Sequence, residues 1–300
     1  MKLGIVVVYL VGPENGALLD LHLGQIEKHT RLPYTIYGSV NRLQPEFRRR
    51  LERQPQVKIC DCPTTDLRSS EEHSHYLEYL TKFAIEDGAS HVVTLHVDSF
   101  PVRPGWEEEL ALNLTGSCAF TTIERINTAC LFFHRDFYLK YAPSFLPSEN
   151  QKKRWSFKKF LRTYNAIPHS GSGFGFAAFE NGLTWHVLPR TTTFAAFGRI
   201  YADLIFHLRK TVWIGDVRPA KRSALAGSSY HHILKLVTGA LRIVVPAKFR
   251  PAFRRTLKAF MDRFVDEPRL AYEQEHLESA RQALLKDPEG FLRDLRSGRI

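Results

Sequence analysis

The sequence predicts an α/β fold with a Rossmann-like order of elements: a mixed, mostly parallel sheet flanked by helices, then a helical, basic C-terminal extension. In roughly the first 215 residues, short β-branched and apolar runs alternate with helix-length segments, as in βαβ units. After about residue 217 the strand pattern stops, and Lys and Arg accumulate. These observations divide the chain into an α/β domain, 1–217, and an extension, 218–300.

Each element of the first domain has its own signal. The β-branched run near the N-terminus lacks a small-residue cleavage site and is interpreted as a strand rather than a signal peptide. A serine followed by Glu71 and Glu72 marks a helix start. Strands are expected at 3–10, 34–40, 57–60, 91–96, 118–123, 129–133 and 184–188, and helices at 17–29, 45–54, 70–87 and 174–181.

Composition excludes several classes of protein. Four cysteines are too few for a disulfide scaffold, and Cys60-x-Cys62 lacks the second pair of a zinc finger. No run of about 18 uncharged apolar residues is present, so we expect no simple membrane-spanning helix and a cytoplasmic location. The net charge of +11 is concentrated between Lys235 and Arg263, where eight basic residues stand against one aspartate.

One carboxylate stands out in VVTLHVDSFPVRPGW. Asp98 follows the apolar strand 91–96, and ligands of open α/β sheets bind at the carboxyl ends of strands. A carboxylate there can hold Mn²⁺ or Mg²⁺, which neutralises the diphosphate leaving group of a nucleotide sugar. The alternative is a solvated turn aspartate that caps the next helix, and the residues alone leave both open.

The segment HSHYLEYLTKFAIEDGASHVVTLHVDSFPVRPGW, residues 73–106, resembles GT-A-type nucleotide-sugar glycosyltransferases, particularly family-2-like bacterial enzymes. Their Asp-x-Asp motif becomes His96-Val97-Asp98 here, and Gly105-Trp106 also matches; the resemblance extends over residues 3 to about 210. It implies that Asp98 binds the metal. His96 would contact the nucleotide ribose or the metal, unless it is a core histidine satisfied by backbone.

The resemblance also implies a late metal ligand. The run from Tyr201 to His207 is similar to a Tyr-x-Asp-x-x-Phe-His pattern near the end of such domains, which makes His207 the candidate. Arg209 and Lys210 would neutralise the diphosphate. The alternative is a surface helix end with basic residues near its carbonyls.

No carboxylate stands where such enzymes commonly carry a general base. His169 is nearest to that position, and an imidazole can exchange a proton near neutral pH. Asp203, Glu124 and Glu180 are alternatives, and a retaining mechanism would need no such base. A solvated loop histidine is the remaining interpretation, and the stereochemistry stays open.

Four further residues are candidates for binding the nucleotide sugar. Tyr9 and Asn41 stand at the ends of the first two expected strands, and Asp66 and His75 stand in the next loop and helix. Each residue type in isolation is more often structural. Their shared place at one edge of the sheet is what favours binding.

Residues 231–264 are predicted to form two short amphipathic helices with basic polar faces, which is typical of peripheral binding to an anionic membrane. The alternative is that both apolar faces pack on the first domain. Nucleic acid is not an expected partner, because the aromatic residues lie on the apolar face of the second helix, opposite the basic ones.

Together these features predict a metal-dependent glycosyltransferase with a nucleotide-sugar donor and a glycan or lipid-linked acceptor. The resemblance and the basic segment suggest bacterial surface polysaccharide or lipopolysaccharide synthesis at the inner membrane face. The rival interpretations are a nucleotidyltransferase on a related fold, or a non-catalytic peripheral membrane-binding protein. The turn VGPENG argues against the first rival, because it lacks a Gly-rich, basic triphosphate loop.

Overall fold

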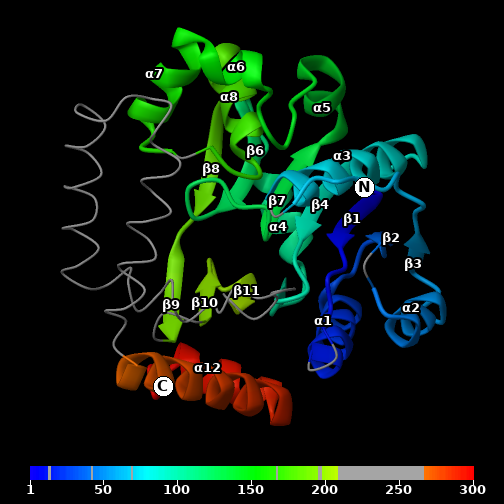
Figure 1. Ribbon diagram of the computed structural model, residues 1–300, viewed down its shortest axis with the longest axis vertical. Helices are drawn as coiled ribbons and strands as arrows, with labels where there is room; N and C mark the ends of the chain where they lie inside the picture. Colours follow the sequence, from blue (N-terminus) through cyan, green and yellow to red (C-terminus); the bar gives the residue numbers. More distant parts are fainter. Residues whose placement is uncertain (13–14, 42, 69, 167, 195–197, 209–266) are drawn as a thin grey trace. The chain divides into compact units, whose positions relative to one another are not determined.

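The computed structural model describes residues 1–12, 15–41, 43–68, 70–166, 168–194, 198–208 and 267–300 (Figure 1). The chain forms two compact units, Met1–Ile214 together with Glu289–Ile300, and Gly215–Pro288. Within the second unit the described helix is α12 (Glu267–Lys286). The predicted boundary at 217/218 stays a prediction.

The first unit is built on a seven-stranded sheet in the order β3-β2-β1-β4-β7-β6-β8. Neighbours β3, β2, β1 and β4 run parallel, as do β6 and β8, whereas β7 runs antiparallel to both β4 and β6. The predicted mixed, mostly parallel sheet flanked by helices is therefore confirmed. Its strands are β1 (Leu3–Val8), β2 (Tyr34–Ser39), β3 (Val57–Ile59), β4 (His91–Leu95), β6 (Cys118–Ile123), β7 (Cys130–His134) and β8 (Thr184–Leu188).

Helices cover this sheet by packing apolar stripes on it, as α3 does. β1 is buried along its whole length, and α3 packs on it through Tyr76, Leu77, Leu80 and Ala84. Burial of both faces of β1 explains its nearly continuous apolar run. The helices of this unit before α8 are α1 (Gly16–His29), α2 (Pro45–Glu52), α3 (Ser70–Glu86), α4 (Trp106–Leu112), α5 (Arg135–Tyr141), α6 (Glu149–Lys153) and α7 (Trp155–Thr163).

A second, four-stranded antiparallel sheet was not predicted. Its order is β5-β11-β10-β9, and its strands are β5 (Ser99–Pro101), β9 (Arg190–Phe194), β10 (Gly198–Tyr201) and β11 (Ile205–Leu208). In Figure 1, β9, β10 and β11 lie below the large sheet. β10 and β11 are joined by a short turn, in which Ala202 and Asp203 both have positive φ.

Three glycines at alternating positions, Gly171, Gly173 and Gly175, allow close packing at the start of α8 (Ser172–Glu180). Gly171 precedes the helix with φ +93°. A Cβ on Gly173 would lie 1.9 Å from the Ser144 carbonyl oxygen, and one on Gly175 would lie 2.2 Å from Ile126 Cδ1. The helix itself begins and ends within two residues of the predicted range.

The last helix belongs to the first unit. In α13 (Pro288–Arg296), Phe291 makes an edge-to-face contact with Phe206, their ring centroids 6.1 Å apart. Arg296 donates to the Val102 carbonyl at 3.2 Å, and Glu289 lies 2.5 Å from Lys28 Nζ. Within the described residues, no helix combines the length and apolar character needed to cross a membrane.

Candidate active site

The strand order reverses direction between β1 and β4. Successive parallel strands run outwards from β1 to β2 and β3, and the chain then returns to place β4 on the other side of β1. Such a switch point leaves a crevice at the carboxyl ends of the two strands. Tyr9 follows β1 directly, and His96 and Asp98 follow β4, so these sequence candidates stand on the two sides of the switch point.

A tight turn fixes Asp98 after β4. Ser99 N donates to the His96 carbonyl at 2.9 Å, and Ser99 Oγ accepts from His96 N at 2.8 Å. Ser99 Oγ also lies 2.6 Å from the Ala129 carbonyl, which ties the turn to the loop before β7. Asp98 is consequently held with only 5% of its surface exposed.

His207 follows Asp98 by more than one hundred residues in the sequence. The second sheet places it beside the turn that holds Asp98. β11 pairs with β5 so that His207 stands opposite Ser99, and Leu208 N donates to the Asp98 carbonyl at 2.7 Å. Here His207 is a strand residue, 6% exposed, and not the end of a surface helix.

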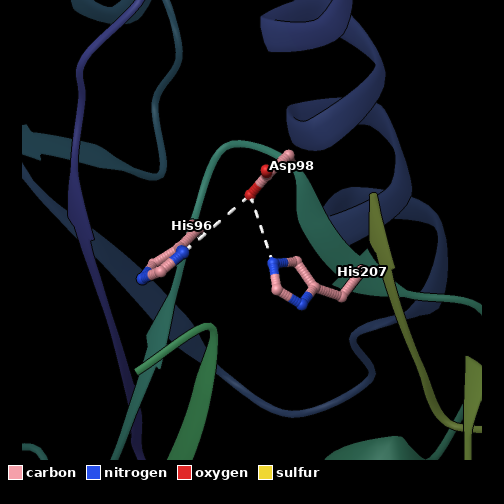
Figure 2. A group of neighbouring side chains, drawn as sticks. All are labelled: His96, Asp98 and His207. Atoms are coloured by element: carbon pink, nitrogen blue, oxygen red, sulfur yellow. Dashed lines mark ion pairs between the residues drawn. The ribbon is translucent and has the colours of Figure 1, made fainter. Parts of the chain in front are cut away.

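Three side chains converge as a result (Figure 2). Asp98 Oδ1 lies 3.9 Å from His96 Nδ1 and 3.8 Å from His207 Nε2. One ligand atom from each of the three residues lies within 4.8 Å of the other two. Two ligands that each bind one ion at about 2.1 Å are at most about 4.2 Å apart, so a small inward movement brings all three onto one cation. The sequence left the nucleotide ribose, the metal and a core position open for His96, and the structure groups this residue with Asp98 and His207.

The surroundings of the His96 ring favour its neutral form, which is the form that can bind a metal. Burial, together with the nearby rings of His73, His207 and His22, lowers the pKa of His96 well below its usual 6.5. Its Nε2 lies 3.1 Å from Thr128 Oγ1, so a hydrogen on Nε2 leaves the lone pair on Nδ1, which faces Asp98.

A pocket of about 810 Å³ adjoins this cluster. Thr128, the hydrogen-bond partner of His96, forms part of its wall, and so does Arg199, which stands directly opposite His207 on β10. Residues opposite each other on antiparallel strands point to the same face. The polar and charged lining is Glu124, Arg125, Asn127, Thr128, His169, Ser170, Arg190, Arg199 and Tyr201.

His169 lines the pocket and has a defined tautomer. Its Nδ1 lies 2.6 Å from the Ser170 carbonyl oxygen, which can only accept a hydrogen bond. The hydrogen of the neutral ring is therefore on Nδ1, and Nε2 carries the basic lone pair. This arrangement suits a residue that takes a proton from a hydroxyl group.

The alternative bases occupy different environments. Glu124 lines the pocket, has a left-handed backbone (φ 54°), forms an ion pair with Arg199 and accepts from Tyr201 Oη at 2.8 Å. Asp203 lies in the β10–β11 turn, 3.7 Å from Arg296, and Glu180 pairs with Arg154 at 2.7 Å. Neither Asp203 nor Glu180 lines the pocket.

Three of the four remaining nucleotide candidates within the described residues have structural partners. Tyr9 is fully buried against the His22 ring, and Asn41 donates to the Cys62 carbonyl at 2.9 Å, which joins the loops after β2 and β3. His75 Nε2 lies 3.1 Å from the Pro63 carbonyl, and Asp66 is exposed in the loop before α3. The structure thus brings none of these four into the His96–Asp98–His207 cluster.

Arg209, Lys210 and the basic segment 231–264 lie outside the described residues. Sequence reasoning missed Arg190 and Arg199, whose only signal is a basic side chain within a short strand. It also missed Thr128, which no motif marks.

Comparisons with known proteins give remote structural matches. The chain matches no family model and no curated protein. Among solved structures, mouse xyloside xylosyltransferase 1 is 10% identical with a TM-score of 0.39, over 63% of this chain and 85% of that one. The Streptococcus pneumoniae glycosyltransferase GlyE is 11% identical with a TM-score of 0.37, over 63% and 45%. An active-site mutant of LgtC is 10% identical with a TM-score of 0.34, over 63% and 73%. At such values, the activity has to be argued from the site itself.

Proposed function

We propose that this protein is a metal-dependent glycosyltransferase, which moves a sugar from a nucleoside-diphosphate donor to a hydroxyl of a glycan or lipid-linked acceptor. One observation carries the proposal: half-buried His96 and buried Asp98 and His207 form a cluster at the switch point of a mostly parallel sheet, beside a large polar pocket. That edge is where open α/β sheets bind nucleotides.

The ligand atoms of the cluster suit a divalent cation that accepts both nitrogen and oxygen ligands. One carboxylate and two imidazoles are ligands that suit Mn²⁺ better than Mg²⁺, since Mg²⁺ prefers oxygen. The bound ion would supply positive charge to the diphosphate leaving group. Asp98 would bind it as the anionic ligand, with His96 and His207 as the neutral ones, and Arg209 and Lys210 would add charge at the phosphates.

The pocket would hold the acceptor. His169 Nε2 would take the proton of the attacking hydroxyl in an inverting transfer, because its Nδ1 is already occupied with Ser170. Glu124 is held by Arg199 and Tyr201. It would receive a hydrogen bond from a hydroxyl of the acceptor substrate, and it would not take up a proton. The donor-side candidates Tyr9, Asn41, Asp66 and His75 remain proposed contacts of the nucleotide.

The test is a thermal-shift series with UDP, GDP, CDP, dTDP and CMP, each with Mn²⁺, with Mg²⁺ and with a chelator. We expect one nucleotide to raise the melting temperature with metal, most strongly with Mn²⁺, and Asp98→Ala to abolish the rise. Asp136→Ala is the matched control, because Asp136 follows β7, whose carboxyl end is at the opposite edge of the sheet. If no nucleotide raises the melting temperature of the wild type, the proposal is wrong.

We further propose that residues 231–264 hold the enzyme on an anionic inner-membrane surface, as part of bacterial polysaccharide or lipopolysaccharide synthesis. The support is the sequence alone: eight basic residues against one aspartate between Lys235 and Arg263, interleaved with apolar residues at helical spacing. Flotation with vesicles of phosphatidylglycerol and phosphatidylcholine tests it. Equal recovery on vesicles of phosphatidylcholine alone would contradict an electrostatic attachment.

A further inference from the structure

The pocket beside the cluster is lined by three guanidinium groups against one carboxylate. Arg125, Arg190 and Arg199 face it, with Glu124 as the anionic residue of the lining. Of the three arginines, Arg199 is already neutralised by its ion pair with Glu124. The pocket therefore has two cationic side chains beyond those that pair with each other.

The side chains of Arg190 and Arg125 differ in the hydrogen bonds that they already form. Arg125 donates to the Asn165 carbonyl through one nitrogen. Among the described residues, Arg190 has neither a hydrogen bond nor an ion pair to its side chain, and it is exposed to the pocket. A planar guanidinium with all its donors available is suited to bind a carboxylate or phosphate through two hydrogen bonds.

The register of the second sheet separates Arg190 from the metal cluster. His207 stands opposite Arg199, whereas Arg190 stands opposite Tyr201, two residues further along β10. Two residues of an antiparallel strand span about 7 Å. A diphosphate that is held at His207 and Asp98 would therefore lie nearer Arg199, and Arg190 would face the part of the pocket farther from the cluster.

We infer that the acceptor carries an anionic group, a phosphate or a carboxylate, and that Arg190 binds it with help from Arg125. This inference rests on the proposed function, because it identifies the substrate class of the same site. An acceptor of this kind is a sugar phosphate or a uronic acid unit. Its charge fixes the position of the neighbouring hydroxyl before transfer, at a distance from the donor phosphates.

The experiment uses the full chain, saturated with Mn²⁺ and with the nucleotide found in the thermal-shift series, so that the donor phosphate site is filled. Binding of glucose 6-phosphate, glucuronate and glucose is then measured by calorimetry. We expect at least one anionic probe to bind about ten- to a hundredfold more tightly than glucose. Arg190→Gln should remove that difference, and Arg53→Gln, which removes the same charge from the end of α2 outside the pocket, should retain it.

Three outcomes overturn the inference. One is that neither anionic probe binds more tightly than glucose. Another is that Arg190→Gln and Arg53→Gln behave alike. The third is that Arg190→Gln weakens binding of the nucleotide itself, which would assign Arg190 to the donor. Failure of the wild type to bind any nucleotide with metal is a separate result, and it counts against the proposed function instead.

Discussion

His22 lies in α1 with its ring fully buried beneath the switch point. Its Nδ1 lies 3.0 Å from the Ser99 carbonyl oxygen and must donate to it, which leaves Nε2 without a hydrogen-bond partner among the described residues. A second proton would place an unsatisfied N–H in the interior. Burial lowers the pKa of His22 to about 4, although the hydrogen bond to Ser99 opposes the shift.

The pH dependence of stability follows from this shift. In the unfolded chain the histidine has its usual pKa near 6.5, so between pH 6.5 and 4 the unfolded state binds more protons. The free energy of unfolding should therefore fall as the pH is lowered through that window. His22→Asn, which retains a donor for the Ser99 carbonyl, should show a slope that is shallower by up to about 1.4 kcal/mol per pH unit. Urea titrations between pH 4 and 7 measure both slopes, and parallel slopes would contradict the assignment.

At the scale of elements, the start of α8 depends on a close approach between backbones. Gly173 meets the Ser144 carbonyl oxygen, a backbone atom that no side-chain rotation can move away. Gly24 in α1 offers a contrast, because a Cβ there would meet nothing within 4 Å.

We expect opposite effects from alanine at these two glycines. Gly173→Ala should lower the free energy of unfolding by more than about 2 kcal/mol, because α8 has to shift away from Ser144. Gly24→Ala should raise it by up to about 1 kcal/mol, because alanine is the better helix former. Urea denaturation followed by circular dichroism gives both values. A neutral Gly173→Ala would mean that the Ser144 segment adjusts freely.

The two sheets differ in how well the sequence predicts them. The strands of the large sheet were predicted within about two residues, because most of them are apolar or β-branched runs between helix or turn signals. β5, β10 and β11 have only three or four residues and no clear alternation. Each becomes a strand only by pairing with a distant segment, and the local pattern of residues does not specify that pairing.

The same limit applies to the site. Asp98 was predicted because it is a carboxylate at a strand end, and His207 was reached through resemblance. The role of His96 stayed open between nucleotide and metal, because nothing in its spacing shows which way the ring points. The pocket arginines depend on the register of β9 and β10, which the sequence does not specify.

At the scale of the whole molecule, the first compact unit is completed by residues from the last helix. α13 buries Phe291, Leu292 and Leu295, and Phe291 contacts Phe206, the neighbour of His207. Arg296 bonds to Val102 and lies near Asp203 in the β10–β11 turn. The final helix thus supports the strand that carries a proposed metal ligand.

Deletion of residues 288–300 should destabilise the first unit. Three buried apolar side chains contribute about 1.5–3 kcal/mol each, so the melting temperature should fall by at least about 5 °C. Mn²⁺ should also bind more weakly, because β11 loses its support. Differential scanning calorimetry and Mn²⁺ titration of the shortened chain measure the two effects. An unchanged melting temperature would show that α13 is dispensable.

The β5–β11 pairing has a consequence for biosynthesis. On a ribosome, the segment that carries Asp98 emerges more than one hundred residues before His207. A nascent chain that ends before β10 has the large sheet but only two of the three clustered side chains, and it lacks Arg190's partner strand. The chain therefore acquires the complete His96–Asp98–His207 cluster only late in translation, after the large sheet has emerged.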